Sequence, residues 1–158
     1  MKDSEVIKKG EGIIQEMLKL TQVEATAKVS MEVDEEDNKY LKVDVSGDDL
    51  GYLIGYKGMT LNSLQSIFGQ ILSKEIEDIV TVSIDINNYR AKRKDYLVSL
   101  AQRAMQEALD SGQNVELPPL SAYERRVIHM TLKSEEGVTT ESEGEGFDRH
   151  VVIKIVKK

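Results

Sequence analysis

The sequence predicts an α+β protein built from two small domains. Amphipathic helical patterns alternate with short runs in which every second residue is apolar, which indicates mixed helices and strands. The pattern breaks at Asn87-Asn88, where an alternating run ends and a long helical pattern begins. With 158 residues and 40% hydrophobic content, the chain can bury two modest cores. We therefore expect one domain at residues 1–87 and another at residues 88–158.

The first domain reads as six elements in the order α-β-β-α-α-β. The helices show apolar residues at a 3.6-residue period and the strands alternate apolar with polar residues. Gly47 and the acidic run Asp34–Asp37 supply turns between these elements. The expected elements are helix 4–20, strands 27–33 and 41–45, helices 49–54 and 59–76, and strand 79–86.

The second domain reads as a smaller α+β unit. A long helix spans residues 89–110 and stops at Ser111-Gly112. Residues 115–117 form a short extended piece, and the capping box Ser121–Glu124 opens a helix that reaches Leu132. Strands at 138–142 and 149–156 close the domain through a glycine-containing turn.

The composition excludes several kinds of site. There are no cysteines and only two histidines, so disulfides, thiolate zinc sites and cysteine nucleophiles are excluded, and we expect neither a metal nor a cofactor. No stretch reads as a signal peptide or a membrane-spanning helix. We therefore expect a cytoplasmic protein without direct membrane insertion.

Charge is distributed unevenly along the chain, whose net charge is −7. Residues 1–86 hold 9 Lys/Arg and 17 Asp/Glu, a net charge of −8, while residues 87–158 hold 12 and 11, a net charge of +1. Lysine and arginine supply most non-specific affinity for phosphate. Any nucleic acid should therefore draw much of its electrostatic attraction from the second half.

The segment Ile54-Gly55-Tyr56-Lys57-Gly58 lies between two helical patterns. Its spacing is neither the dinucleotide-binding GxGxxG nor a P-loop. Two glycines three residues apart allow close approach to a sugar-phosphate backbone, and Lys57 adds a cation. A KH GxxG loop works in this way, and the preceding element order is that of a type II KH domain. Ile54 and Leu61 are expected to form an apolar floor for bases; the alternative is a plain helix–turn–helix connection.

Basic residues cluster at the start of the long helix, where they oppose the helix dipole. A nucleic-acid contact and a solvated face paired with acids of the first domain explain this cluster equally well. Its members are Arg90, Lys92, Arg93 and Lys94.

The capped helix carries Arg125 and His129, four residues apart and therefore on one face, with Arg126 beside them. Arginine and histidine suit contacts to phosphate or bases. A structural histidine bonded to a neighbouring group is an equal alternative. No nucleophile or carboxylate accompanies the pair at a recognisable spacing, so we do not expect catalysis.

Together these motifs resemble the Jag (SpoIIIJ-associated protein) family, which joins a KH domain to a domain with an Arg-x-x-x-His signature, here called the RxxxH domain. The match runs through Leu53–Leu61, Tyr89-Arg90, Tyr123–His129, Thr140–Gly144 and Arg149–Ile153. The family often has an additional small N-terminal domain, for which this chain begins too late.

The resemblance implies a non-catalytic protein that binds RNA or single-stranded nucleic acid, with Arg149 among the contacts. It further implies a part in bacterial cell elongation, division or sporulation control and a small single-KH partner protein; a homo-oligomer is possible if the KH domain pairs with itself. Two rival interpretations remain. The acidic KH half could pair with another protein, or Arg125 and His129 could serve a phosphate-ester enzyme.

Overall fold

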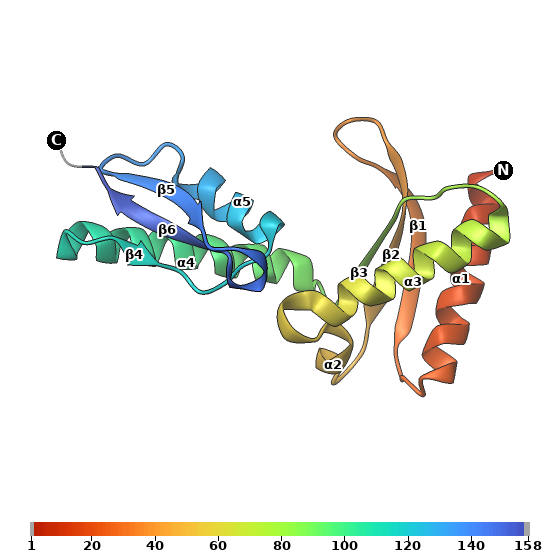
Figure 1. Ribbon diagram of the computed structural model, residues 1–158. Helices are drawn as coiled ribbons and strands as arrows, with labels where there is room; N and C mark the ends of the chain where they lie inside the picture. Colours follow the sequence, from red (N-terminus) through yellow and green to blue (C-terminus); the bar gives the residue numbers. More distant parts are fainter. Residues whose placement is uncertain (1, 157–158) are drawn as a thin grey trace. The chain divides into compact units, whose positions relative to one another are not determined.

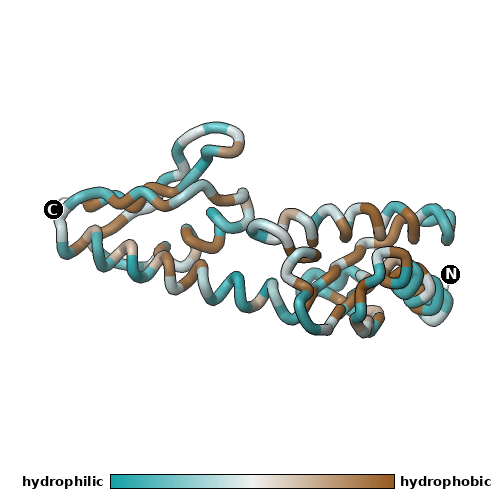
Figure 2. The backbone as a smooth tube through the Cα atoms, turned by 90° about the horizontal axis from the view of Figure 1, so that it is seen from below, coloured by the Kyte–Doolittle hydropathy of each residue, from teal (hydrophilic) through white to brown (hydrophobic). Residues whose placement is uncertain are grey.

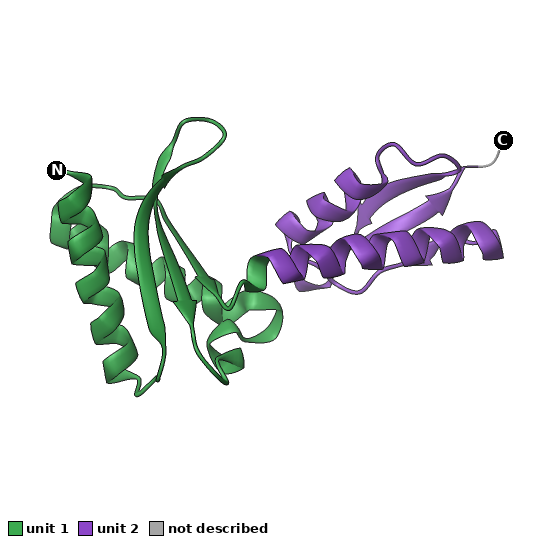
Figure 3. Ribbon diagram, turned by 180° about the vertical axis from the view of Figure 1, so that it is seen from behind, with its two compact units in different colours: residues 1–90 green, residues 91–158 purple. Residues whose placement is uncertain are grey.

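The computed structural model describes residues 2–156, which form two compact units: unit 1 extends to Arg90 and unit 2 begins at Ala91 (Figure 3). Each unit has its own three-stranded sheet and its own apolar core. The mixed α+β class that the sequence predicts is confirmed.

Unit 1 has the predicted element order, helix-strand-strand-helix-helix-strand (Figure 1). Its sheet has the order β1-β2-β3, in which β1 and β2 are antiparallel and β2 and β3 are parallel. The elements are α1 (Asp3–Leu20), β1 (Thr26–Val33), β2 (Lys39–Ser46), α2 (Gly51–Ile54), the 3-10 turn η1 (Tyr56–Gly58), α3 (Met59–Ile76) and β3 (Val82–Ile86).

The helices α1 and α3 pack on one face of this sheet (Figure 1). The alternating apolar residues of β2 and β3 and the apolar side of α3 together form a core around Leu41, Val43 and Phe68, all with no exposed surface. Apolar positions, brown in Figure 2, recur along the helices and strands, as expected for elements that turn one side toward a core. Gly10 lets α1 approach closely, because a Cβ there would lie 2.8 Å from Leu41 Cδ2.

The strand predicted at residues 79–86 begins later, at Val82. After α3 ends at Ile76, Glu77 takes a left-handed conformation and the amide of Asp78 donates to the Ser73 carbonyl. The following residues lead to the sheet, and Ile79 among them is exposed. The apolar alternation of the strand begins at Val80, two residues before β3 itself.

Unit 2 places two helices on one face of an antiparallel sheet with the order β4-β6-β5. Small residues of α4, including Ala101, face Ile128 of α5 and Val151 of β6 in a core without exposed surface. The elements are α4 (Tyr89–Ser111), whose first two residues belong to unit 1, β4 (Val115–Glu116), α5 (Ala122–Leu132), β5 (Val138–Glu143), the 3-10 turn η2 (Gly146–Asp148) and β6 (His150–Ile155).

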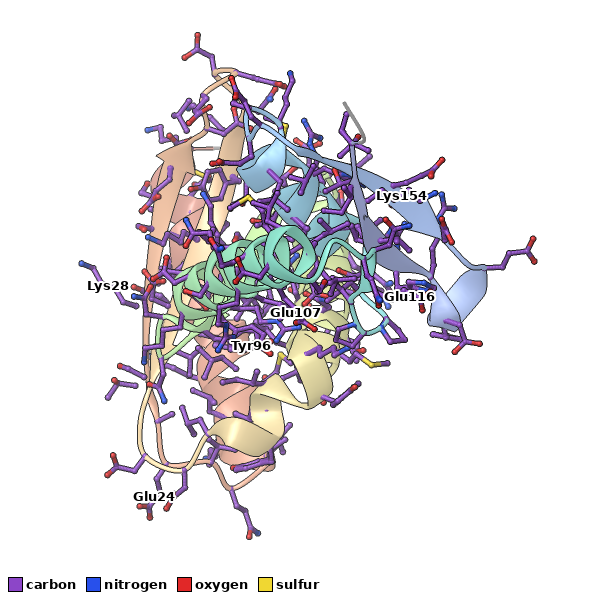
Figure 4. The ribbon with its side chains drawn as sticks, turned by 90° about the vertical axis from the view of Figure 1, so that its left-hand side faces the viewer. Glu24, Lys28, Tyr96, Glu107, Glu116 and Lys154 are labelled. Carbon is purple, nitrogen blue, oxygen red and sulfur yellow. The ribbon has the colours of Figure 1, made fainter. Side chains whose placement is uncertain are left out.

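The other face of the second sheet is mainly polar, although Val152 also lies on it and is buried. Lys154, labelled on β6 in Figure 4, forms ion pairs with Glu141 and Glu143 of β5. These two carboxylates raise the pKa of Lys154 to about 12. Successive residues of a strand face opposite sides, so Thr140 and Ser142 lie on the helix-covered side of β5.

An ion pair with little solvent exposure joins α4 to α5. Glu124, only 5% exposed, accepts hydrogen bonds from Arg93 Nε at 2.8 Å and from the Ser121 amide at 2.9 Å. Arg93 Nη2 lies 2.7 Å from the same carboxylate. The predicted capping box is present, since Ser121 Oγ accepts from the Glu124 amide. One carboxylate thus caps α5 and holds Arg93.

Replacing Arg93 with alanine should destabilise unit 2 by about 3–5 kcal/mol, because it leaves the buried Glu124 carboxylate without its partner. The matched control is Lys94→Ala, an exposed neighbour whose loss should cost less than about 0.5 kcal/mol. Urea unfolding followed by NMR amide signals of unit 2 measures both. Equal stability of the two variants would contradict the role given to this ion pair.

Candidate nucleic-acid interface

The glycine loop, residues Gly55–Gly58, has a backbone that only glycine fits at two positions. Gly55 lies at φ 71°, ψ −174° and Gly58 at φ 79°, both outside the comfortable range of other residues. A Cβ on Gly55 would lie 2.0 Å from Thr60 Oγ1, and one on Gly58 would lie 2.9 Å from the Tyr89 ring. Both glycines are therefore required by the local packing, independently of any ligand.

The tip of the loop presents an aromatic ring and a cation. Tyr56 is 74% exposed, and Lys57 Nζ lies 5.1 Å from the centre of its ring. Lys57 itself has a left-handed backbone, with φ 50°. This geometry turns the chain sharply between α2 and α3 and leaves the Tyr56 ring exposed to solvent.

The apolar floor expected from Ile54 and Leu61 is only partly present. Ile54 is half-buried, but Leu61 is 1% exposed and lies within the core of unit 1. The expectation for Leu61 is therefore wrong, because α3 turns this side chain toward the sheet. Met59, two residues earlier on the helix, is exposed instead.

The first arginine of the basic cluster is engaged within unit 1. Arg90 Nε donates to the Ile84 carbonyl at 3.0 Å, and its Nη2 donates to Gln65 Oε1 at 2.9 Å. Gln65 Oε1 also accepts the Ile84 amide at 2.9 Å. Arg90 therefore fastens the start of α4 to α3 and β3.

The remaining basic residues of α4 divide into two kinds. Arg93 is held by Glu124 and also lies 5.1 Å from the Tyr96 ring centre. Lys92 and Lys94 have exposed side chains. The structure thus brings Arg90 and Arg93 into intramolecular contacts, and the side chains of Lys92 and Lys94 are exposed to solvent.

The Arg-x-x-x-His pair lies where α5 faces β5. His129 Nδ1 is 2.6 Å from Thr140 Oγ1 and its Nε2 is 3.1 Å from Ser142 Oγ. Arg125 Nη1 donates to the Leu120 carbonyl at 2.8 Å. His129 is therefore half-buried, and its ring bridges a helix and a strand through two hydroxyls, as the alternative of a structural histidine expects.

The surroundings of His129 favour its neutral form. Burial lowers the pKa of His129 first, and the nearby Arg125 guanidinium lowers it further. A neutral imidazole donates from one nitrogen and accepts at the other, which matches its two hydroxyl partners. Arg126 and Arg149, by contrast, are exposed and can reach a ligand.

Sequence reasoning did not anticipate three of the residues that shape this region. Glu124 was recognised as a cap but not as the partner of Arg93, and Thr140 and Ser142 were not connected to His129. The signal available for the latter pair was the i, i+2 spacing of two hydroxyls on one strand, which places both on the same face.

Neither a metal site nor a membrane span is found in the described part of the chain. Among residues 2–156, no three His, Asp or Glu side chains are grouped so that they could hold a metal ion. Within the same range, no helix combines the length and apolar character needed to cross a bilayer.

Comparison with known proteins identifies both units. The KhpA/KhpB type of KH domain matches residues 11–86, and the domain named for its Arg-x-x-x-His signature, the RxxxH domain, matches residues 95–154. RNA-binding protein KhpB of Clostridium symbiosum is 38% identical over 130 residues, covering 82% of this chain and 58% of that protein. RNA-binding protein KhpB of Bacillus subtilis (strain 168) is 34% identical over 135 residues, covering 84% and 65%. The chain thus spans roughly three fifths of these relatives.

The environment of His129 predicts a stability that falls at mildly acidic pH. Its pKa is lowered in the folded chain, so between the ordinary histidine value near 6.5 and the lowered value only the unfolded chain binds the proton. The free energy of unfolding of unit 2 should decrease across this interval, and His129→Gln should remove that decrease. Imidazole NMR titration and urea unfolding measure the two effects; a His129 midpoint above 6.5 would contradict the assignment.

Proposed function

We propose that this chain, which belongs to the Jag family of proteins with a KH domain and an RxxxH domain, binds single-stranded RNA and does not transform it. Its relatives in Clostridium symbiosum and Bacillus subtilis are each named an RNA-binding protein. By the family resemblance, we place this binding in the cytoplasm and in the control of bacterial cell elongation, division or sporulation. A small single-KH protein is the proposed companion.

The observation that carries this proposal is the conformation of the glycine loop. The left-handed backbone at Gly55, Lys57 and Gly58 turns the chain sharply into α3, and Tyr56 stands exposed between the two glycines. KH loops clamp the backbone of about four nucleotides in this manner. Ile54, Tyr56 and Lys57 are the proposed contacts around Gly55 and Gly58.

The second proposed contact surface is on unit 2, where the charge is more favourable. Arg126 of α5 and Arg149, which directly precedes β6, are exposed cations, while unit 1 carries a net charge of −8 over residues 1–86. Arg125 retains donors beyond its bond to Leu120. The proposed cations are Lys92, Lys94, Arg125, Arg126 and Arg149; for Arg90, Arg93 and His129, the intramolecular bonds favour a supporting role.

Reversing the charge of the loop lysine should weaken RNA binding. We expect Lys57→Glu to raise the dissociation constant for a single-stranded RNA about tenfold, because a phosphate contact becomes a repulsion. Lys28→Glu is the matched control, with the same charge change on an exposed residue of β1, labelled in Figure 4. Fluorescence polarisation measures both. If both variants lose affinity equally, RNA binding depends only on the overall charge of the chain. Lys57 would then not be a specific phosphate contact.

A protein-pairing role is the second candidate, and a specific surface favours it. Leu20 at the end of α1 and Ile67 and Ile71 on α3 are exposed apolar residues. Leu20, Ile71 and Met17 line a groove of about 410 Å³ between α1 and α3, together with the charged residues Lys9, Glu16 and Glu75. Apolar surface of this kind is typical of contact sites between proteins.

Changing Ile71 to aspartate would test that candidate. If this groove joins two chains, Ile71→Asp should convert an oligomer to a monomer in light scattering, because it places a charge in the apolar contact. RNA affinity of the monomer then distinguishes the two functions. A wild-type chain that is monomeric at all accessible concentrations would exclude self-pairing through this groove.

A further inference from the structure

The β5–β6 turn presents an aromatic side chain almost entirely to water. Phe147 is 93% exposed, the largest exposed fraction among the large apolar residues of residues 2–156. It lies in η2, which is closed by hydrogen bonds from the Asp148 amide to the Glu145 carbonyl and from the Arg149 amide to the Gly146 carbonyl. Phe147 is not among the residues that form the apolar core of unit 2 or pack against it. Packing within unit 2 therefore does not account for an aromatic residue at this position.

The turn that carries Phe147 is held in a defined shape. Gly144 has φ 82°, and a Cβ there would lie 2.9 Å from the Asp148 carbonyl oxygen, so the two arms of the turn are in close contact. His150 Nδ1 lies 2.9 Å from the same carbonyl oxygen. The exposed ring is therefore presented by a preformed turn, which reduces the entropy that a partner must overcome on binding.

This turn lies beside the N-terminal end of α5 (Figure 1). The Leu120 amide donates to the Arg149 carbonyl at 3.0 Å, and the Leu120 carbonyl accepts from Arg125 Nη1 at 2.8 Å. Tyr123, at the second position of α5, is also exposed, at 65%. Two exposed aromatic residues, the arginines of α5 and Arg149 after η2 thus lie at one end of unit 2.

Positive charges and flat rings lie together at this end. Arg125, Arg126 and Arg149 contribute three positive charges, against Glu145 and Asp148 in the turn and Glu116, which lies 4.0 Å from His150 Nε2. Two further carboxylates are already occupied, because Glu143 pairs with Lys154 and Glu124 pairs with Arg93. Aromatic faces beside arginines are the chemistry that stacks nucleobases and contacts phosphates.

We infer that Phe147, assisted by Tyr123, is a stacking residue for unpaired bases of RNA, with Arg126 and Arg149 at the adjoining phosphates. This inference rests on the proposed function and adds to it a second base-contacting site, on unit 2. Stacking needs no particular base, because each base has a flat face. The site therefore takes single-stranded RNA of mixed sequence and not a duplex, whose bases are already stacked.

The test compares variants of the 158-residue chain on one single-stranded RNA of mixed sequence. Phe147→Ala should weaken binding about tenfold, the size expected for losing one stacked base. Phe147→Leu keeps apolar surface without a ring and should be nearly as weak, whereas Phe147→Tyr should restore most of the affinity. Val156→Ala, which shortens another exposed apolar residue of unit 2, is the matched control and should bind as the wild type.

Salt dependence separates stacking from charge. Loss of the Phe147 ring should lower the affinity without changing the slope of log K against log salt concentration, because no ion contact is lost. Arg149→Gln should reduce that slope by about one contact. RNA carrying 5-bromouridine should also photocrosslink to Phe147 or Tyr123 in the wild-type chain.

Four outcomes would overturn the inference, and they are distinguishable. If the wild-type chain binds no RNA, the proposed function and this inference fail together. If it binds and Phe147→Ala equals Val156→Ala, the stacking site alone fails. If Phe147→Leu matches the wild type, the contact is apolar without stacking. If Phe147→Ala changes the oligomeric state while RNA affinity is unchanged, the ring belongs to a protein contact.

Discussion

The first two turns of α4 provide the contacts on which both units depend. The ring of Tyr89 lies against Gly58 and so fixes the position of the glycine loop from outside the α2–α3 connection. Arg90 joins α3 and β3, and Arg93 neutralises the buried carboxylate that caps α5. Removing a buried partner costs more than the pair contributes, because the remaining charge is left without water. The first role of these residues is therefore structural.

This constraint changes how the basic cluster should be understood. Two of its four members, Arg90 and Arg93, lie in contacts that a phosphate would have to displace. Counting basic residues along a sequence treats every cation as equally accessible, although the geometry here separates supporting arginines from surface lysines. The Arg125–His129 pair also combines a structural residue with an available one. His129 is hydrogen-bonded to Thr140 and Ser142, whereas Arg125 has N–H donors beyond the one bonded to the Leu120 carbonyl.

The periodic elements were predictable because each rests on a local rule. Apolar periodicity identified both sheets and the longer helices, and the capping box placed the start of α5 at Ser121. The predicted strand begins three residues too early because Val80 continues the alternation of Val82, Ile84 and Ile86 into the segment that precedes β3. Contacts between distant residues follow no such local rule. Arg93 and Glu124 are 31 positions apart, and neither the basic cluster nor the capping box predicts that their side chains form an ion pair. Phe147 is a lone aromatic residue without a period, and only the turn geometry shows that its ring faces solvent.

An acidic chain that binds RNA must rely on forces other than counterion release. Phosphate contacts give affinity that falls steeply with salt, and here the net charge is −7 and several arginines are engaged internally. Close backbone approach at the glycine loop and stacking on exposed rings depend much less on salt. In the proposed mode of binding, Tyr56 and Phe147 would provide contacts of this kind, one on each unit. Such a protein would select flexible single strands, because only unpaired bases can leave their neighbours to stack on a side chain.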